Sequence, residues 1–185
     1  MVSSRYRSTM AETILVFGAT GKQGGSVVKN LLQDKEKFRI RAVTRNPDSD
    51  KGKALTALGV EVVKADLNNK ESVRRAVQGA QGVYLVTDTD YTVPDIYAAE
   101  YKQIKDAADA CKKAGVGKVV FSTQPKQNRT DILPAPEIDS KTDGFTYIQS
   151  IGVPVAGVSL MVYMENMSQA YFTKKERDGV YSFRK

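Results

Sequence analysis

Apolar residues in this chain form short runs, separated by longer stretches in which they recur at helical spacing. The short runs favour β-strands, because their length and their valine and isoleucine content suit a buried strand. The predicted strands lie at 14–17, 38–44, 60–65, 82–87, 118–122 and 153–160. The predicted helices lie at 22–33, 50–58, 70–78, 96–114 and 139–151. A helix over 163–171 and a strand over 180–183 complete the prediction.

Strands and helices alternate in this prediction, which is the order of repeated strand–helix–strand units. Such units join parallel strands through right-handed crossovers, and they favour an α/β fold with a doubly wound parallel sheet of the Rossmann type. Ligands bind beyond the carboxyl ends of the strands in that fold. Polar residues that directly follow a predicted strand are therefore site candidates. These are residues 18–23, Arg45, Asp66, Thr87, Asp88, Ser122 and Thr123.

The first predicted strand runs into a glycine-rich turn, Gly18-Ala-Thr-Gly21-Lys-Gln-Gly24, and then into a helix. Backbone N–H groups at such a helix start, together with the helix dipole, favour a phosphate. Gly18 would permit the tight turn, Gly21 the approach of a pyrophosphate, and Gly24 close packing of helix on strand. A turn without a ligand is the alternative, since the glycine pattern is weak by itself. The strand before it and the apolar helical stripe after it favour a dinucleotide.

The residue after the second predicted strand bears on which dinucleotide binds. NAD-selective folds usually place Asp or Glu there, where the carboxylate bonds the ribose 2′-hydroxyl. Here Thr44 ends the strand, Arg45 follows, and the next carboxylate is Asp48. A guanidinium matches a 2′-phosphate, and Lys22 can add a second cation. We therefore predict NADP(H) rather than NAD; the alternative is that Arg45 is an ordinary solvated cation.

The composition is that of a globular domain. The chain has 185 residues, 41% of them hydrophobic and 26% charged, and this length suits one domain. We predict a disordered tail over 1–11 and one dinucleotide-binding domain over 12–185. The net charge of +7 comes from scattered lysines and arginines without a long basic stripe, which disfavours direct nucleic-acid binding. No apolar run reaches the length of a membrane span.

Cysteine and histidine are scarce in this chain. Cys111 is the single cysteine, which excludes an intrachain disulfide framework and fits a reducing compartment, cytoplasmic or nuclear. Its place on a predicted helix face favours a core position over a nucleophile. The chain has no histidine, and we predict no metal site.

Five segments, in order and at plausible spacing, carry a family resemblance. They are FGATGKQGGSVVKNLL (17–32), VTRNPDS (43–49), GVEVVKADLNN (59–69), LVTD (85–88) and the EIDSK…IGVP…YMEN series (137–166). With them the chain resembles the NmrA-like family, a branch of the atypical short-chain dehydrogenase/reductase superfamily. Members are similar in fold to NADPH-dependent reductases. Several act instead as redox sensors or transcriptional co-regulators that bind NADP(H) and a protein partner.

The resemblance implies a set of cofactor contacts. Residues 18–23 would hold the pyrophosphate, and Lys102 would face the loop after the fourth strand. Lys141 would sit near the nicotinamide ribose, and residues 163–166 would close the nicotinamide end. Together with Gly24, the predicted contacts are Gly18, Ala19, Thr20, Gly21, Lys22, Gln23, Arg45 (2′-phosphate), Asp66 and Leu67 (adenine), Thr87, Asp88, Thr89, Lys102, Lys141, Tyr163, Met164, Glu165 and Asn166.

A catalytic pair is missing from its expected place. Ordinary short-chain dehydrogenases use Tyr-xxx-Lys on the helix after the fifth strand, where the lysine lowers the pKa of the tyrosine. The spacing occurs here at 101–105 and 171–175, on other elements. The expected helix has Lys141 with Glu137 four residues earlier, where family members often have histidine. Lys141 either hydrogen-bonds the ribose or, as in reductases of the isoflavone reductase type, acts as an acid/base.

Family members generally run well beyond this chain, so the resemblance implies that the C-terminal substrate domain is largely missing. An open cleft lacks the desolvation that favours hydride transfer, and apolar residues around 162–172 would favour self-association. The first hypothesis is an NADP(H)-binding redox sensor or transcriptional co-regulator that acts through a protein partner or a homo-oligomer. The second is an NADPH-dependent oxidoreductase of small carbonyl or quinone-like substrates. A third, a fold that binds nothing, is disfavoured by the intact glycines and Arg45.

Overall fold

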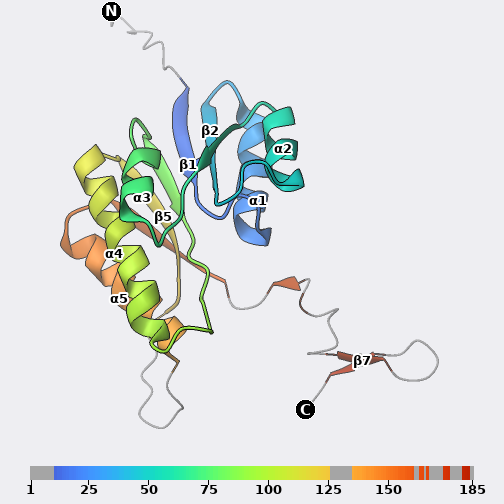
Figure 1. Ribbon diagram of the computed structural model, residues 1–185, viewed down its shortest axis with the longest axis vertical. Helices are drawn as coiled ribbons and strands as arrows, with labels where there is room; N and C mark the ends of the chain where they lie inside the picture. The colour runs from blue at the N-terminus through green and yellow to red at the C-terminus, as the bar shows by residue number, and fades with distance from the viewer. Residues whose placement is uncertain are drawn as a thin grey trace, which may run out of the picture.

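A parallel sheet with helices on both faces forms the body of the molecule (Figure 1). The computed structural model describes residues 11–125 and 135–160, Tyr163, Met164 and Asn166, and the backbone of 173–175 and 181–183. The strands lie in the order β3 (Glu61–Lys64), β2 (Phe38–Thr44), β1 (Glu12–Val16), β4 (Gly82–Leu85), β5 (Lys118–Thr123) and β6 (Val155–Ser159). The order reverses between β1 and β4, which is where a doubly wound sheet opens a crevice. The predicted Rossmann fold is confirmed.

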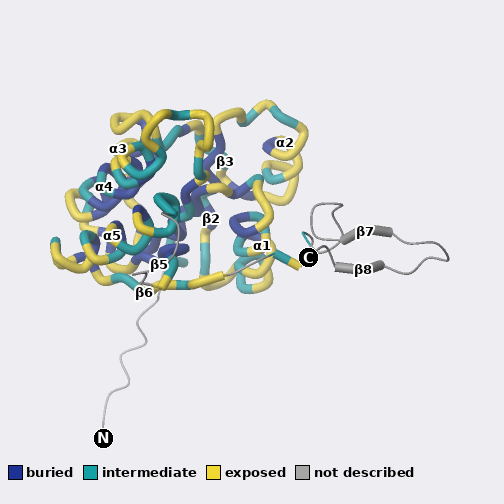
Figure 2. Tube along the Cα trace, turned by 90° about the horizontal axis from the view of Figure 1, so that it is seen from below, coloured by how far each residue is buried: buried dark blue, intermediate teal, exposed yellow. Residues whose placement is uncertain are grey.

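The helices form two layers, one on each face of the sheet (Figure 1). One face carries α1 (Lys22–Leu31), followed by a short 3-10 turn (Leu32–Asp34), and α2 (Asp50–Ala57). The other carries α3 (Lys70–Ala76), α4 (Ile96–Ala114) and α5 (Pro136–Ser150). Figure 2 shows buried residues concentrated between sheet and helices, with exposed positions on the outer helix surfaces.

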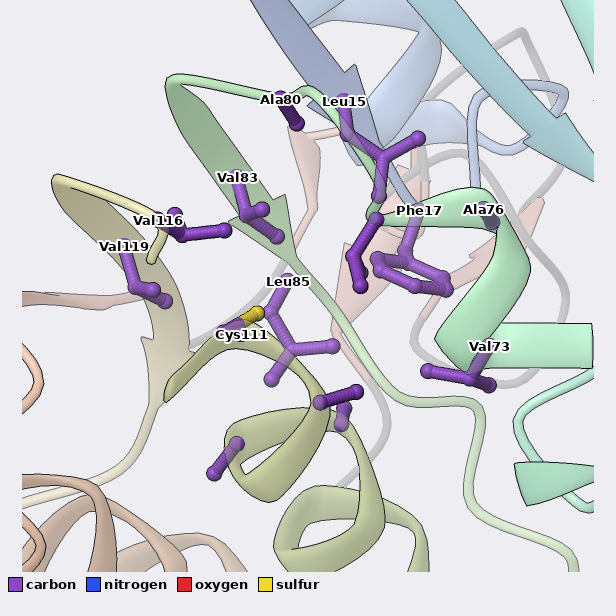
Figure 3. Close-up of a cluster of buried hydrophobic side chains, with 14 of the residues drawn as sticks. Leu15, Phe17, Val73, Ala76, Ala80, Val83, Leu85, Cys111, Val116 and Val119 are labelled. Atoms are coloured by element: carbon purple, nitrogen blue, oxygen red, sulfur yellow. The ribbon is translucent and has the colours of Figure 1, made fainter. Parts of the chain in front are cut away.

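Alternation along β1 divides the core between the two faces, because successive strand residues point to opposite sides. Leu15 and Phe17 lie in the larger cluster, under α3, α4 and α5 (Figure 3). Ile14 and Val16 lie in the smaller one, with Val28 of α1. Cys111 belongs to the larger cluster, as predicted, and burial raises the pKa of its thiol to about 12.

The element boundaries agree with the prediction within a few residues, apart from the C-terminal part. Helix α5 begins at Pro136, three residues before its predicted start, because proline suits the first turn of a helix. The predicted strand over 180–183 is present as β8 (Tyr181–Phe183), paired antiparallel with β7 (Thr173–Lys175). The pattern did not predict β7, whose sequence Thr-Lys-Lys has no apolar alternation. The predicted helix over 163–171 lies mostly outside the described residues, as do residues 1–10 of the predicted tail.

Candidate functional site

A cleft of about 960 Å³ lies beyond the carboxyl ends of β1 to β4. Its walls come from the loops after these strands, with Gln103 of α4 and Tyr163. The predicted contacts that it brings together are Gly18, Thr20, Gly21, Lys22, Gln23, Gly24, Arg45, Asp66, Leu67, Thr87, Asp88, Thr89 and Tyr163. Those that do not line it are Ala19, Lys102, Lys141, Met164 and Asn166; Glu165 lies outside the described residues. Ser122 and Thr123 do not line it either.

The glycine turn is built by close backbone approach. Gly18 has φ +62°, a left-handed conformation that favours glycine, and a Cβ there would lie 2.8 Å from Val86 Cγ1. A Cβ on Gly24 would overlap the carbonyl oxygen of Gly18. This is the close helix–strand packing expected of Gly24, and it places the first turn of α1 directly against the turn after β1.

The N-terminus of α1 differs from those of the three helices that follow it. Side-chain oxygens of Ser49, Asn69 and Asp95 cap α2, α3 and α4, with donor–acceptor distances of 3.2, 3.0 and 2.8 Å. Helix α1 instead starts after Gly21, with no side-chain cap and no acidic residue in its first turn. Its first-turn N–H groups thus keep their capacity to bind an anion in the cleft.

Cations lie along the same side of the cleft. Arg45 is 74% exposed, and its Nη2 lies 3.8 Å from Asp88 Oδ2, which is itself 91% exposed. Such an exposed pair is weak, so the guanidinium is available to a ligand. Lys51 of α2 donates from Nζ to the carbonyl oxygen of Thr20, at 3.2 Å. Lys51 was not among the predicted contacts. Its position in the first turn of the helix that follows Arg45 was a signal that could have indicated a second cation at the cleft.

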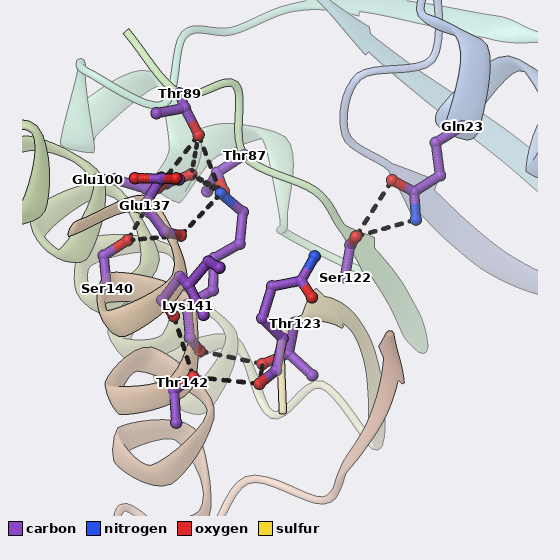
Figure 4. Close-up of polar contacts among 12 residues, drawn as sticks. Gln23, Thr87, Thr89, Glu100, Ser122, Thr123, Glu137, Ser140, Lys141 and Thr142 are labelled. Atoms are coloured by element: carbon purple, nitrogen blue, oxygen red, sulfur yellow. Dashed lines mark hydrogen bonds and ion pairs between the residues drawn. The ribbon is translucent and has the colours of Figure 1, made fainter. Parts of the chain in front are cut away.

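Lys22 and Gln23 of the glycine turn have different roles. Lys22 reaches across the cleft mouth, where Nζ donates to Asn166 Oδ1 at 2.9 Å and lies 5.6 Å from the Tyr163 ring centroid. Gln23 is buried and donates from Nε2 to Tyr84 Oη at 2.7 Å. The same nitrogen donates to Ser122 Oγ at 2.9 Å, a contact drawn in Figure 4. Its side chain therefore ties α1 to β4 and β5, and only its backbone N–H is left for a ligand.

Two tyrosine hydroxyls, those of Tyr163 and Tyr84, are hydrogen-bonded to the Gln23 side chain. Tyr163 donates from its hydroxyl to Gln23 Oε1 at 3.1 Å, which connects the C-terminal segment to α1. Burial raises the pKa of Tyr84, against the opposing effect of its hydrogen bond with Gln23. Tyr84 therefore stays a neutral phenol, and the network carries no charge of its own.

A buried ion pair supports the opposite wall. Lys141 Nζ lies 2.5 Å from Glu100 Oε1, with the two side chains 12% and 2% exposed. Thr87 Oγ1 donates to the same carboxylate at 2.6 Å, and Ser140 Oγ donates to its other oxygen at 2.8 Å (Figure 4). Lys141 also donates to Thr89 Oγ1 at 3.0 Å. The lysine does not line the cleft, and its Nζ contacts one cleft residue directly, through the Thr89 hydroxyl.

Glu100 was absent from the predicted site. It lies four residues before Ile104 on the buried face of α4, among apolar positions. A carboxylate on such a stripe was the signal that could have found it, because a buried charge needs a partner.

Lys102 and the Tyr-xxx-Lys spacing at 101–105 lie apart from the cleft lining. Lys102 was predicted to face the loop after β4; its Nζ lies 2.7 Å from Asp106 Oδ2, one helical turn away, and it does not line the cleft. Lys105 donates to Tyr147 Oη at 2.9 Å, between α4 and α5. Tyr101 stacks on Tyr97 with ring centroids 5.6 Å apart. The Lys105–Tyr147 contact joins α4 to α5, whereas the Lys102 ion pair and the stack of the two tyrosine rings lie within α4. The other spacing, 171–175, begins outside the described residues.

In the part of the chain that the structure describes, no group of three or more cysteine, aspartate or glutamate side chains could hold a metal ion. No described helix combines the length and apolar character needed to cross a membrane.

Comparison with known proteins places this fold and site in context. The profile of the NmrA-like family matches residues 10–184. An NmrA-like family domain-containing protein of Dictyostelium discoideum is 36% identical over 176 residues, 90% of this chain and 56% of that protein. The NmrA-like family domain-containing oxidoreductase malD of Malbranchea aurantiaca is 42% identical over 114 residues, 60% of this chain and 34% of that protein. The chain therefore spans little more than half, or less, of these relatives.

Among solved structures, NmrA, a negative transcriptional regulator in complex with NADP, has the same fold. It matches with a TM-score of 0.76 and 23% identity, over 93% of this chain and 53% of that one.

Proposed function

The chain belongs to the NmrA-like family, and we propose that it binds NADP(H) in the cleft at the carboxyl ends of β1 to β4. The observation that carries this proposal is the uncapped first turn of α1, which opens into the cleft beside exposed cations. Helix dipole and free N–H groups suit a pyrophosphate there. NmrA, a solved structure with this fold, is complexed with NADP.

The cleft residues divide into groups that match the parts of this cofactor. The turn over 18–24 would hold the pyrophosphate, with Lys51 adding positive charge beside Thr20. Arg45 would bind the 2′-phosphate, and Asp66 and Leu67 would flank the adenine. Bound NADPH would supply a hydride, while the residues of this chain would bind and position the cofactor.

As its role, we propose that the chain senses the bound cofactor and acts through a protein partner or a second copy, as a redox sensor or transcriptional co-regulator in the cytoplasm or nucleus. The support is that Lys141, the candidate acid/base, is engaged by Glu100, Thr89 and a backbone carbonyl. A lysine held in this way supports the wall better than it transfers protons. The fold neighbour NmrA is itself a transcriptional regulator.

Reductase activity on small carbonyl or quinone-like substrates is the second candidate. One reason is that malD, a relative, is named as an oxidoreductase. A second is that Tyr163 lines the cleft, because a tyrosine hydroxyl can act as a general acid in a reduction. Oxidation of NADPH that depends on added quinone would support this candidate and contradict the purely regulatory one.

Calorimetric titration with NADPH and NADH tests the cofactor proposal, on the wild type and on Arg45→Ala. We expect Arg45→Ala to lose about 1.5–3 kcal/mol of NADPH binding, about tenfold to a hundredfold in affinity, with NADH binding unchanged. Arg75→Ala is the matched control, because Arg75 is 68% exposed with a carboxylate also 3.8 Å away, outside the cleft. Absence of NADPH binding by the wild type would overturn the proposal.

A further inference from the structure

Gln103 of α4 holds an unsatisfied polar atom next to the cleft. Among the residues that the structure describes, its Oε1 is the one buried side-chain oxygen or nitrogen without a hydrogen-bond partner. The side chain is 8% exposed, and it lines the cleft beside Ala65 and Leu67. Native proteins rarely leave such an atom unpaired, so it calls for a donor that the chain itself does not provide.

The other end of the same amide is already engaged. Gln103 Nε2 donates to Asn68 Oδ1 at 2.9 Å, and the backbone N–H of Asn68 donates to Asp66 Oδ1 at 2.9 Å. This chain of contacts holds the amide between α4 and the loop after β3. This contact uses one of the two Nε2 hydrogens, and the unpaired Oε1 is the hydrogen-bond acceptor that the amide offers to the cleft.

The surroundings of Gln103 select the kind of donor that would fit. Ala65 and Leu67 present apolar surface in the same wall, which suits the flat face of a base. Arg45 lines the same cleft and follows β2, the strand next to β3 in the sheet. A group that joins a flat ring to an N–H donor, close to a 2′-phosphate site, is the 6-aminopurine of an adenine nucleotide.

We propose that Gln103 Oε1 accepts a hydrogen bond from the 6-amino group of adenine and makes this chain selective for 6-aminopurine over 6-oxopurine dinucleotides. The inference rests on the proposed NADP(H) binding and adds the group that recognises the base. A hypoxanthine base would place a carbonyl oxygen against the glutamine oxygen, and two facing acceptors repel each other.

The test compares NADPH with its deamino analogue, in which hypoxanthine replaces adenine. Affinities are measured by titration for the wild type, Gln103→Leu and Gln149→Leu, the last being an exposed glutamine of α5 outside the cleft. We expect the wild type and Gln149→Leu to bind NADPH about tenfold to a hundredfold more tightly than the analogue. Gln103→Leu should bind the two dinucleotides with about equal affinity, because leucine has no hydrogen-bond acceptor.

Thermal unfolding of the free variants checks that each one folds. Gln103→Leu leaves Asn68 without its donor, but Asn68 is exposed and water can replace it. Gln103→Met, which is unbranched and similar in length, is the second variant, and it should show the same lost preference.

The outcomes separate this inference from the proposed function. Equal binding of the two dinucleotides by the wild type, tighter binding of the deamino form, or a preference that survives in both Gln103 variants would overturn the role of Gln103 and leave NADP(H) binding standing. A wild type that binds neither dinucleotide would overturn both.

Discussion

The two walls of the cleft differ in whether their charged side chains are exposed or buried. On the α1–α2 side, Arg45 is 74% exposed and lies 3.8 Å from its carboxylate, and the first turn of α1 has no side-chain cap. On the α4–α5 side, the Glu100–Lys141 pair is almost fully buried at 2.5 Å, with hydroxyl donors on both carboxylate oxygens.

This difference separates recognition from support. A charge or N–H group that binds a ligand must stay accessible before the ligand arrives, as on the α1–α2 side. A charge buried without a ligand must be neutralised by its own chain, as on the α4–α5 side. The same type of residue, a basic one near the cleft, therefore has opposite roles on the two walls.

Breaking the supporting wall should have the largest effect. Glu100→Ala would leave Lys141 buried without its counter-charge, and we expect a loss of about 3–5 kcal/mol in the free energy of unfolding, measured in urea. Glu71→Ala removes an exposed partner of Arg74, so as the control it should lose less than about 1 kcal/mol. A Glu100→Leu/Lys141→Met double variant should recover most of the stability. Equal losses in the two single variants would contradict the assignment of Glu100 as a support.

A change on the α1–α2 side should lower the free energy of unfolding less than Glu100→Ala does, and it should weaken NADPH binding. In Gly24→Ala the new Cβ overlaps the Gly18 carbonyl, which forces α1 away from the turn. We expect a loss of about 1–3 kcal/mol in unfolding free energy and weaker NADPH binding in titration. Gly117→Ala is the control, since its Cβ would sit at an ordinary 3.5 Å from Gln81 O. An unchanged NADPH affinity in Gly24→Ala would argue against the pyrophosphate position.

The smallest expected effect is on the free energy of unfolding at high pH, and it comes from Cys111 in the core beneath the cleft. Burial raises the pKa of Cys111 from 9.0 to about 12, so the neutral thiol stabilises the folded state below pH 9. That stabilisation should fall as pH rises through the window from 9 toward 12, by about 1–2 kcal/mol at pH 10. Unfolding in urea across this range measures it, against Cys111→Ala, which should lack this part of the slope. If unfolding free energy had the same pH dependence in the wild type and in Cys111→Ala, the thiol would have the same pKa in the folded and unfolded states.

Much of the fold was predictable because its signals are local. Short apolar runs placed the strands of the main sheet, and helical spacing placed the helices packed on it. The glycine turn with Arg45 located one wall of the cleft. The strand β7 was missed because three polar residues carry no periodic signal. Gln23 was predicted as a cofactor contact, yet its side chain turns inward to Tyr84 and Ser122, residues far from it in sequence.

The sequence by itself determined the family, the order of strands and helices, and the edge of the sheet where a ligand would bind, since each depends on neighbouring residues and their spacing. Only the tertiary structure decided which polar groups there are engaged and which are left open. Glu100 meets Lys141, Lys51 meets Thr20, and Gln103 keeps an unpaired oxygen. These outcomes depend on contacts between distant segments and on burial, which no local spacing encodes.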